Sequence, residues 1–251
     1  MSHNPIFNRA LATGVEDARI QAAQAEIDAQ FDSIVAGRKM TIEGTSMKVL
    51  GLFAVLLVTA AATMIFNLQF LTLPAMFVGL GLGLWATFAR KVRPAVMIAY
   101  AATQGVFLAG ITSVFEAMYP GIAMQAVTAT LAVAGAMFAA YAFGWIKVTP
   151  GFTKVMLFAV IGYAVFGIGN LIFAMATGGS GAYSSEFGWL IALVGAGLAA
   201  FTLNLDFESV KQGVAHGLPA ENEWRAAFGL TSSLIWLYVE ILRLLSIFNR
   251  D

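Results

Sequence analysis

The stretch MKVLGLFAVLLVTAAATMIF, residues Met47–Phe66, contains one charged side chain, Lys48, and is otherwise almost wholly apolar. A helix of about 20 residues rises about 30 Å, which matches the hydrocarbon thickness of a bilayer. Strands with open edges are not tolerated in lipid, because their backbone groups would lack hydrogen-bond partners. The stretch therefore predicts a transmembrane helix, and similar stretches follow it along the chain.

Six further apolar stretches of comparable length are separated by short connections. They are Leu71–Ala89, Ala95–Phe115, Ile122–Phe143, Val155–Ala176, Phe187–Leu205 and Ala226–Phe248. We therefore predict an all-α, polytopic membrane protein with a polar N-terminal segment over residues 1–46 and a seven-helix transmembrane domain over residues 47–251. Within the polar segment, residues 14–31 are rich in Ala, Gln, Glu and Asp and predict a solvated or interfacial helix.

The composition agrees with this class and excludes several others. Hydrophobic residues make up 59% of the chain and charged residues 11%, whereas soluble domains average about 45–50% and about 25%. The excess apolar surface must face the lipid bilayer, which is the first predicted partner. The formal net charge of zero argues against a nucleic-acid partner. The chain has no cysteine and only His3 and His216, so thiolate and histidine-rich metal sites are excluded.

Charges in the connections predict the orientation of the chain. Basic residues lie before or at the start of the first apolar stretch and in every second connection, at Arg38, Lys39, Lys48, Arg90, Lys91, Arg93, Lys147 and Lys154. The intervening connections, residues 67–70, 116–121 and 177–186, contain no Lys or Arg. By the positive-inside rule, the N-terminus and the basic connections are cytoplasmic. Seven crossings would place the C-terminus outside, whereas a re-entrant last segment would return it inside, and we expect seven crossings.

A few polar side chains fall within or at the edges of the apolar stretches. They are Glu116, Asn170, Asp206, Glu208, Glu240 and Arg243. A charged residue at the centre of a transmembrane helix costs about 2.5–3.5 kcal/mol on insertion scales, so such residues usually face the interior of a bundle.

Each of these positions has a structural and a functional interpretation. Glu240 and Arg243 are three residues apart, so they can pair within one helix or line a polar cavity. Asp206 is either a solvated carboxylate at a helix end or an inward-facing group. Asn170 either joins two helices by a hydrogen bond or lines the cavity, which Glu116 is also expected to line.

The sequence offers no convincing catalytic constellation. The run Gly178–Gly181 lies in a connection without a histidine nearby and predicts a flexible linker. Residues 207–223, broken by Gly217 and Pro219, predict a connecting loop. We therefore expect neither an enzyme nor a cofactor.

Several segments together resemble the Bax inhibitor-1 family (transmembrane Bax inhibitor motif proteins). The segments are Gly169–Phe173, Leu205–Lys211 and Ala226–Leu245, and those similar to a bacterial branch are Asn4–Phe7, Met40–Glu43, Tyr119–Ile122, Glu223–Trp224 and Trp236–Leu245. The resemblance lies in their order and spacing and covers nearly the whole chain. It implies a bacterial inner-membrane protein in which six helices surround a central last helix, and a pH-sensitive calcium leak.

The resemblance also implies roles for particular residues. In the family, aspartates on the sixth and last helices share a proton, and an arginine at the cytoplasmic end of the second helix acts as a latch. These roles carry over to Asp206 and Arg90, but Ser233 stands where the second aspartate belongs. A proton-sharing pair in the family's form is therefore not expected. Instead we expect Asp206 to bond to Ser233, face Arg90 and stay ionised, with pH sensing moved to more acidic values or to Glu240 and Arg243.

Two functions remain open at this point. The first is a cation leak, for Ca²⁺ or H⁺, with Asp206 and Arg90 as the gate and Glu240, Arg243 and Asn170 along the cavity. The second is a non-transporting membrane protein that modulates a membrane-anchored protease, or another membrane partner, through residues 1–40.

Overall fold

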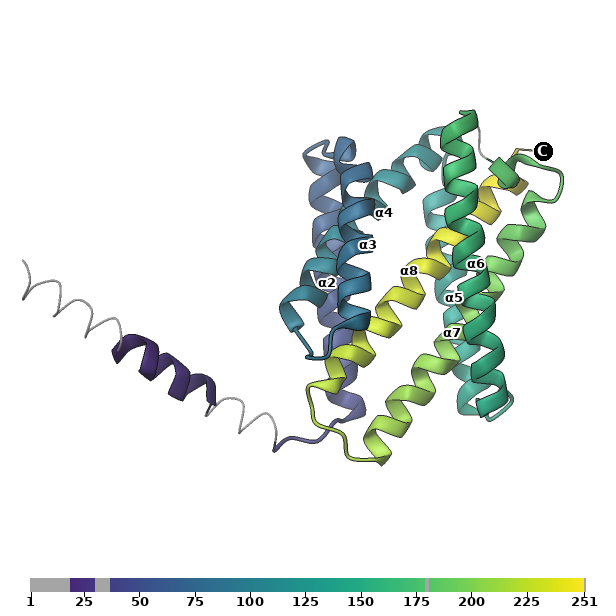
Figure 1. Ribbon diagram of the computed structural model, residues 1–251. Helices are drawn as coiled ribbons and strands as arrows, with labels where there is room; N and C mark the ends of the chain where they lie inside the picture. The colour runs from purple at the N-terminus through teal and green to yellow at the C-terminus, as the bar shows by residue number, and fades with distance from the viewer. Residues whose placement is uncertain (1–18, 30–36, 179–180, 251) are drawn as a thin grey trace, which may run out of the picture.

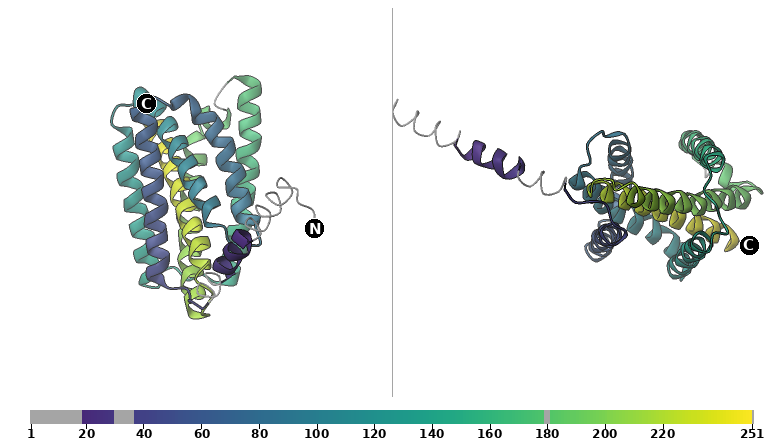
Figure 2. Two further views of the ribbon diagram at one scale, coloured as in Figure 1. Left: turned by 90° about the vertical axis from the view of Figure 1, so that its left-hand side faces the viewer. Right: turned by 90° about the horizontal axis from the view of Figure 1, so that it is seen from below.

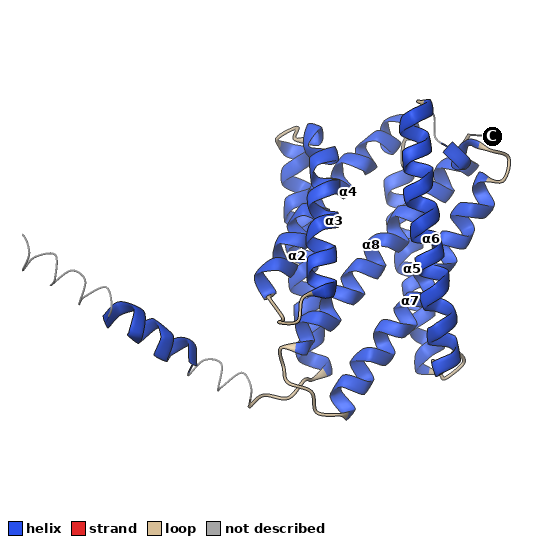
Figure 3. Ribbon diagram, in the orientation of Figure 1, coloured by secondary structure: helices blue, strands red, loops and turns tan. Residues whose placement is uncertain are grey.

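The computed structural model describes residues 19–29, 37–178 and 181–250, and helices dominate these residues (Figures 1 and 3). A helix over residues 19–29 lies within the predicted polar helix. The remaining elements are α2 (Ile42–Ile65), η1 (Gln69–Leu71), α3 (Thr72–Phe88), α4 (Pro94–Met118), α5 (Ile122–Ala142), α6 (Pro150–Thr177), η2 (Gly181–Ser184), α7 (Gly188–Ala215) and α8 (Asn222–Phe248). Seven of these helices are long and apolar enough to cross a membrane, which confirms the predicted all-α class.

Helix α8 lies at the centre of the bundle, as expected. It runs diagonally between the other helices and packs against α2, α4, α5 and α7 (Figures 1 and 2). The helices α3 and α6 are more peripheral, since α3 packs mainly on α4 and α6 mainly on α7. A central helix must satisfy its polar groups through protein neighbours, whereas a peripheral one must present apolar side chains to lipid.

The two ends of the bundle differ in charge. The start of α2 lies at the same end as the connections α3–α4, α5–α6 and α7–α8, and the C-terminus lies at the opposite end (Figure 1). We call the former the basic end, because it holds Arg38, Lys39, residues 90–93 and Lys147. Helix α8 therefore traverses the whole bundle, in agreement with seven crossings.

Several helices extend beyond their expected bounds, among them α6, which starts at Pro150 instead of Val155. Helix α7 continues to Ala215, so the predicted loop over residues 207–223 is wrong for its first half. No Gly or Pro lies between Phe207 and Gln212, Gly213 is buried within the helix, and the turn comes only at Gly217, which has a φ of 61°. Helix α8 starts at Asn222, before the expected Ala226. Helix α2 starts at Ile42, because the side chain of Thr41 accepts a hydrogen bond from the Gly44 amide and caps it.

The predicted linker at Gly178–Gly181 is only partly visible, since residues 179 and 180 lie outside the described residues. Gly178 ends α6 in a left-handed conformation with a φ of 68°, and Gly181 begins η2.

Candidate functional site

Polar side chains of α8 point into the bundle at several levels along its length. Glu223, Thr231, Glu240 and Ser246 are all at most 4% exposed. With a rise of 1.5 Å per residue, Glu223 and Glu240 are separated by about 25 Å along the helix. The polar interior therefore extends from the basic end to the opposite end, and it falls into three groups.

The middle group joins α7 to α8. The Ser233 hydroxyl donates a hydrogen bond of 2.6 Å to Oδ2 of Asp206, which is the contact expected from the sequence. The two helices approach closely here, because a Cβ on Gly229 would lie 2.9 Å from Oδ1 of Asp206. Asp206 is thus an inward-facing group rather than a solvated carboxylate at a helix end.

Arg90 does not take part in this group, which corrects the expectation that Asp206 faces it. Its side chain is exposed, and among the described residues no hydrogen bond or ion pair joins it to Asp206. Helix α3 ends at Phe88 and packs on α4, and Arg90 lies in the α3–α4 connection beside the start of α8. Its carbonyl oxygen instead accepts a hydrogen bond of 2.9 Å from the Arg225 guanidinium. The cation that was expected to keep Asp206 ionised is therefore not beside it.

Buried polar atoms near the middle group lack partners. Both amide atoms of Asn204 and the hydroxyl of Thr231 make no hydrogen bond within the described part of the chain. Asn204 and Thr231 are each 0% exposed. Leaving such a group unsatisfied costs about 1–3 kcal/mol, so this region is one where a polar ligand would be stabilised. Asn204 is not among the polar residues singled out from the sequence, although an amide within an apolar stretch is itself a signal.

The group near the opposite end centres on Glu240. Its carboxylate accepts hydrogen bonds of 2.8 and 2.9 Å from Arg243 and one of 3.2 Å from the indole of Trp236. The predicted pair within α8 is therefore confirmed. The Arg243 guanidinium also lies 4.3 Å from the ring centre of Tyr183 in η2, a cation–π contact that the sequence analysis missed.

Two other elements complete this group. The hydroxyls of Tyr163 on α6 and Tyr183 on η2 lie 2.9 Å apart, and Gly195 on α7 leaves room for them. A Cβ on Gly195 would overlap the Tyr163 hydroxyl and lie 2.8 Å from the carboxyl carbon of Glu240. Small residues commonly permit such close approach between membrane helices.

Asn170 and Glu116 have different surroundings. Asn170 accepts a hydrogen bond of 2.6 Å from the Ala182 amide and so anchors η2 to α6, beside the Glu240 group. Glu116 accepts hydrogen bonds of 2.6 and 2.9 Å from the amides of Gly121 and Ala123, at the start of α5. The structure therefore places Asn170 near Glu240 and Arg243, and Glu116 at a helix cap apart from them.

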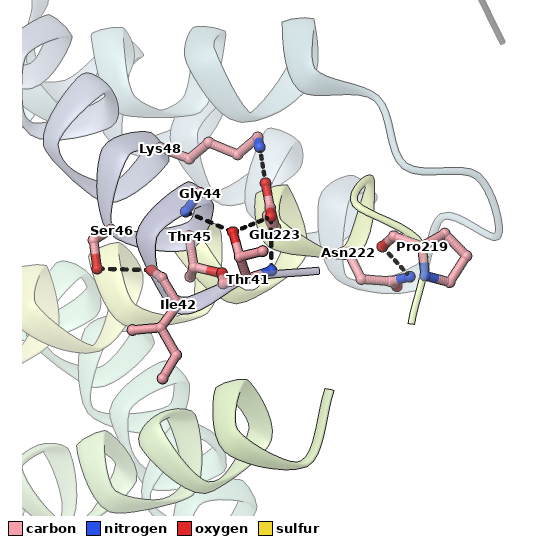
Figure 4. Close-up of polar contacts among 9 residues, drawn as sticks. All are labelled: Thr41, Ile42, Gly44, Thr45, Ser46, Lys48, Pro219, Asn222 and Glu223. Atoms are coloured by element: carbon pink, nitrogen blue, oxygen red, sulfur yellow. Dashed lines mark hydrogen bonds and ion pairs between the residues drawn. The ribbon is translucent and has the colours of Figure 1, made fainter. Parts of the chain in front are cut away.

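The group at the basic end, which we call the clasp, consists of Thr41, Lys48 and Glu223 (Figure 4). The Glu223 carboxylate accepts hydrogen bonds of 2.9 Å from the Thr41 amide and 3.0 Å from its hydroxyl, and forms an ion pair with Lys48. Gly44 allows this approach, because a Cβ there would overlap the carboxylate. Local sequence does not predict the clasp, since Thr41 and Glu223 are 182 residues apart.

Backbone contacts reinforce the clasp. The Met40 amide donates to the Leu218 carbonyl at 2.7 Å, and the Ala220 amide donates to the Arg38 carbonyl at 2.8 Å. The start of α2 is thus bound both to the α7–α8 connection and to the first turn of α8.

Comparison with known proteins identifies the relatives of this chain. A family model described as Bax inhibitor 1 like matches residues 4–250. No curated protein matches the sequence. The family match covers all seven membrane helices and all three polar groups.

Proposed function

The chain belongs to the Bax inhibitor 1 like family, and we propose that it is a non-enzymatic cation leak channel of the cell inner membrane, with its N-terminus cytoplasmic. The observation that carries this proposal is the inward-facing Asp206, bonded to Ser233 between α7 and α8. We further propose that Ca²⁺ or H⁺ is the ion that moves.

The chemistry of the middle group favours a cation. Calcium binds oxygen ligands, and this contact offers the carboxylate of Asp206 and the hydroxyl of Ser233. Among the described residues no cluster of three acidic, His or Cys side chains exists. We therefore propose brief contacts with a passing ion instead of tight binding.

The Ser233–Asp206 hydrogen bond fixes the carboxylate between α7 and α8, where we propose that its charge controls the passage of a cation. A serine hydroxyl can donate or accept, so it can bond Asp206 in either protonation state. We propose that the pH response is accordingly weaker than in a pair of carboxylates.

Calcium uptake by liposomes that contain the purified protein and an enclosed calcium dye tests the channel. We expect uptake above that of protein-free liposomes, a several-fold reduction by Asp206→Ala, and no change with Glu221→Gln, an exposed carboxylate in the α7–α8 connection. Equal uptake by the wild type and Asp206→Ala would contradict the proposed pathway.

A second variant tests the pH argument. Two close carboxylates titrate as a coupled pair, so Ser233→Asp is expected to give calcium uptake a new pH dependence in the neutral range. An unchanged pH profile would show that the α7–α8 contact does not gate the channel.

The exposed helix over residues 19–29 supports the second function, a membrane partner such as an anchored protease. Ile20 and Ile27 are 55% and 64% exposed and seven residues apart, so they share one face of the helix. Deletion of residues 1–36 discriminates between the two functions, because it leaves the clasp and the bundle intact. A channel should keep its calcium uptake, whereas an interaction protein should lose its partner.

A further inference from the structure

A cleft of about 510 Å³ opens on the side of the bundle between α2 and α5, with α7 and α8 as its floor. Its volume lies within the range of about 300–1,000 Å³ that is usual for ligand sites. Carbon-rich side chains form most of its lining, among them Val49, Leu50, Ala134, Phe138, Leu203 and Leu234. Leu50 on α2 is 64% exposed and Phe138 on α5 is 56% exposed, so the cleft is open to the surrounding lipid.

The polar groups of the cleft gather at one end. Ser46, Tyr141 and Lys211 line it where α2 begins and where α5 and α7 end, which is the basic end of the bundle. The Lys211 ammonium lies 5.9 Å from the centre of the Tyr141 ring, and Lys211 is exposed. The nearby Glu208 carboxylate is occupied by hydrogen bonds from Tyr141 and Gln212, at 2.7 and 2.9 Å.

The depth of the cleft can be read from its helices. On α7 the lining extends from Lys211 to Leu203, a rise of about 12 Å, and on α2 from Ile42 to Leu50, again about 12 Å. An apolar slot of this depth with a cation at its mouth matches a molecule whose hydrocarbon chain ends in an anionic group. Basic pockets between transmembrane helices on the cytoplasmic side are suited to anionic lipid headgroups.

We propose that this cleft binds an anionic phospholipid of the adjacent leaflet, with the upper part of one acyl chain between α2 and α5 and the phosphate beside Lys211. The chain would touch Leu203 and Leu234, which are next in sequence to Asn204 and Ser233. Bound lipid would therefore brace the α7–α8 contact from the side. The inference concerns lipid binding alone and holds whether or not the protein conducts ions.

Native mass spectrometry of the protein released from nanodiscs of equal phosphatidylglycerol and phosphatidylcholine tests this site. We expect one phosphatidylglycerol to remain bound after the other lipids are stripped. A single lysine near a membrane surface contributes about five-fold to the binding of anionic lipid, so Lys211→Gln should lower retention by about that factor. Lys154→Gln removes an exposed lysine of α6 at the same end and should leave retention unchanged.

A second pair of variants tests the cleft itself. Ala134→Trp places a large side chain in the slot and should abolish retention of both lipids, whereas Ala164→Trp, on an exposed face of α6, should not. Retention that survives both Lys211→Gln and Ala134→Trp would overturn the proposal. So would equal retention of phosphatidylcholine and phosphatidylglycerol by the wild type. Thermal melts of each variant separate loss of the lipid from loss of the fold.

Discussion

The clasp permits a quantitative test, because its ion pair joins two helices that are far apart in the sequence. We consider Glu223→Gln, Lys48→Met and the double variant. Glutamine keeps an oxygen that can accept the hydrogen bonds from Thr41 but removes the charge, so the first change isolates the ion pair. Methionine keeps most of the apolar length of Lys48, which packs against Trp224 with its ammonium 5.6 Å from the indole ring.

The burial of the two partners sets the magnitude. The side chain of Glu223 is 6% exposed and that of Lys48 is 22% exposed, so the pair is neither a surface contact nor a fully buried one. Breaking a fully buried pair costs about 3–5 kcal/mol, whereas an exposed pair contributes about 0–1 kcal/mol. We therefore expect each single variant to lower the free energy of unfolding by about 2 kcal/mol. The double variant should cost less than the sum of the two by about 1–2 kcal/mol.

Unfolding by sodium dodecyl sulfate in mixed micelles measures these free energies, with the fluorescence of the five tryptophans as the signal. Lys154→Met serves as the control, since it removes an exposed lysine at the same end of the bundle and should change stability by less than about 0.5 kcal/mol. A coupling energy near zero, with both single variants as stable as the control, would refute the view that the clasp holds α8 to α2.

Two further predictions concern the group near the opposite end. Gly195→Leu should destabilise the protein by about 1–3 kcal/mol, because its side chain would meet the Glu240 carboxyl group. Gly197→Leu should be nearly neutral in the same unfolding assay, since nothing lies within 4 Å of its Cβ position, and equal effects would contradict the argument. Asn170→Ala removes the acceptor of the Ala182 amide and should speed hydrogen exchange in η2, with a cost of about 1–3 kcal/mol. Unchanged exchange at that amide would show that the bond does not hold η2.

The helices could be predicted because their signal is local. Length and hydropathy suffice to identify a membrane span, and the seven expected stretches correspond to the seven helices. The predicted helix boundaries are wrong where a helix continues beyond its apolar residues. Helix α7 keeps its hydrogen bonds through the charged residues Glu208 and Lys211, because polar side chains are acceptable once the helix leaves the hydrocarbon region.

The polar contacts likewise differ in how far they could be predicted. The spacing of Glu240 and Arg243 predicts an ion pair, because residues three apart share a helix face. The partner of Asp206 could be expected only through family resemblance, because Ser233 is on another helix. Neither residue spacing nor family resemblance predicted the clasp or the contact between Arg243 and Tyr183. Their partners meet through the arrangement of whole helices, which local sequence does not encode.

The distribution of polarity among the helices nevertheless carries information on their positions. A helix that faces lipid on most sides has to be apolar all round, while one enclosed by protein can keep groups that bond to its neighbours. Only 6% of the most apolar part of α6 is buried in the bundle, and Met156 is its one buried residue among those described. The corresponding share for α8 is 44%. Helix α8 also holds four of the buried polar side chains, Glu223, Thr231, Glu240 and Ser246. Buried polar residues lower the hydropathy of a stretch and so weaken its prediction as a membrane span. The same residues indicate that the helix lies at the centre of the bundle, where a pathway for ions would have to run.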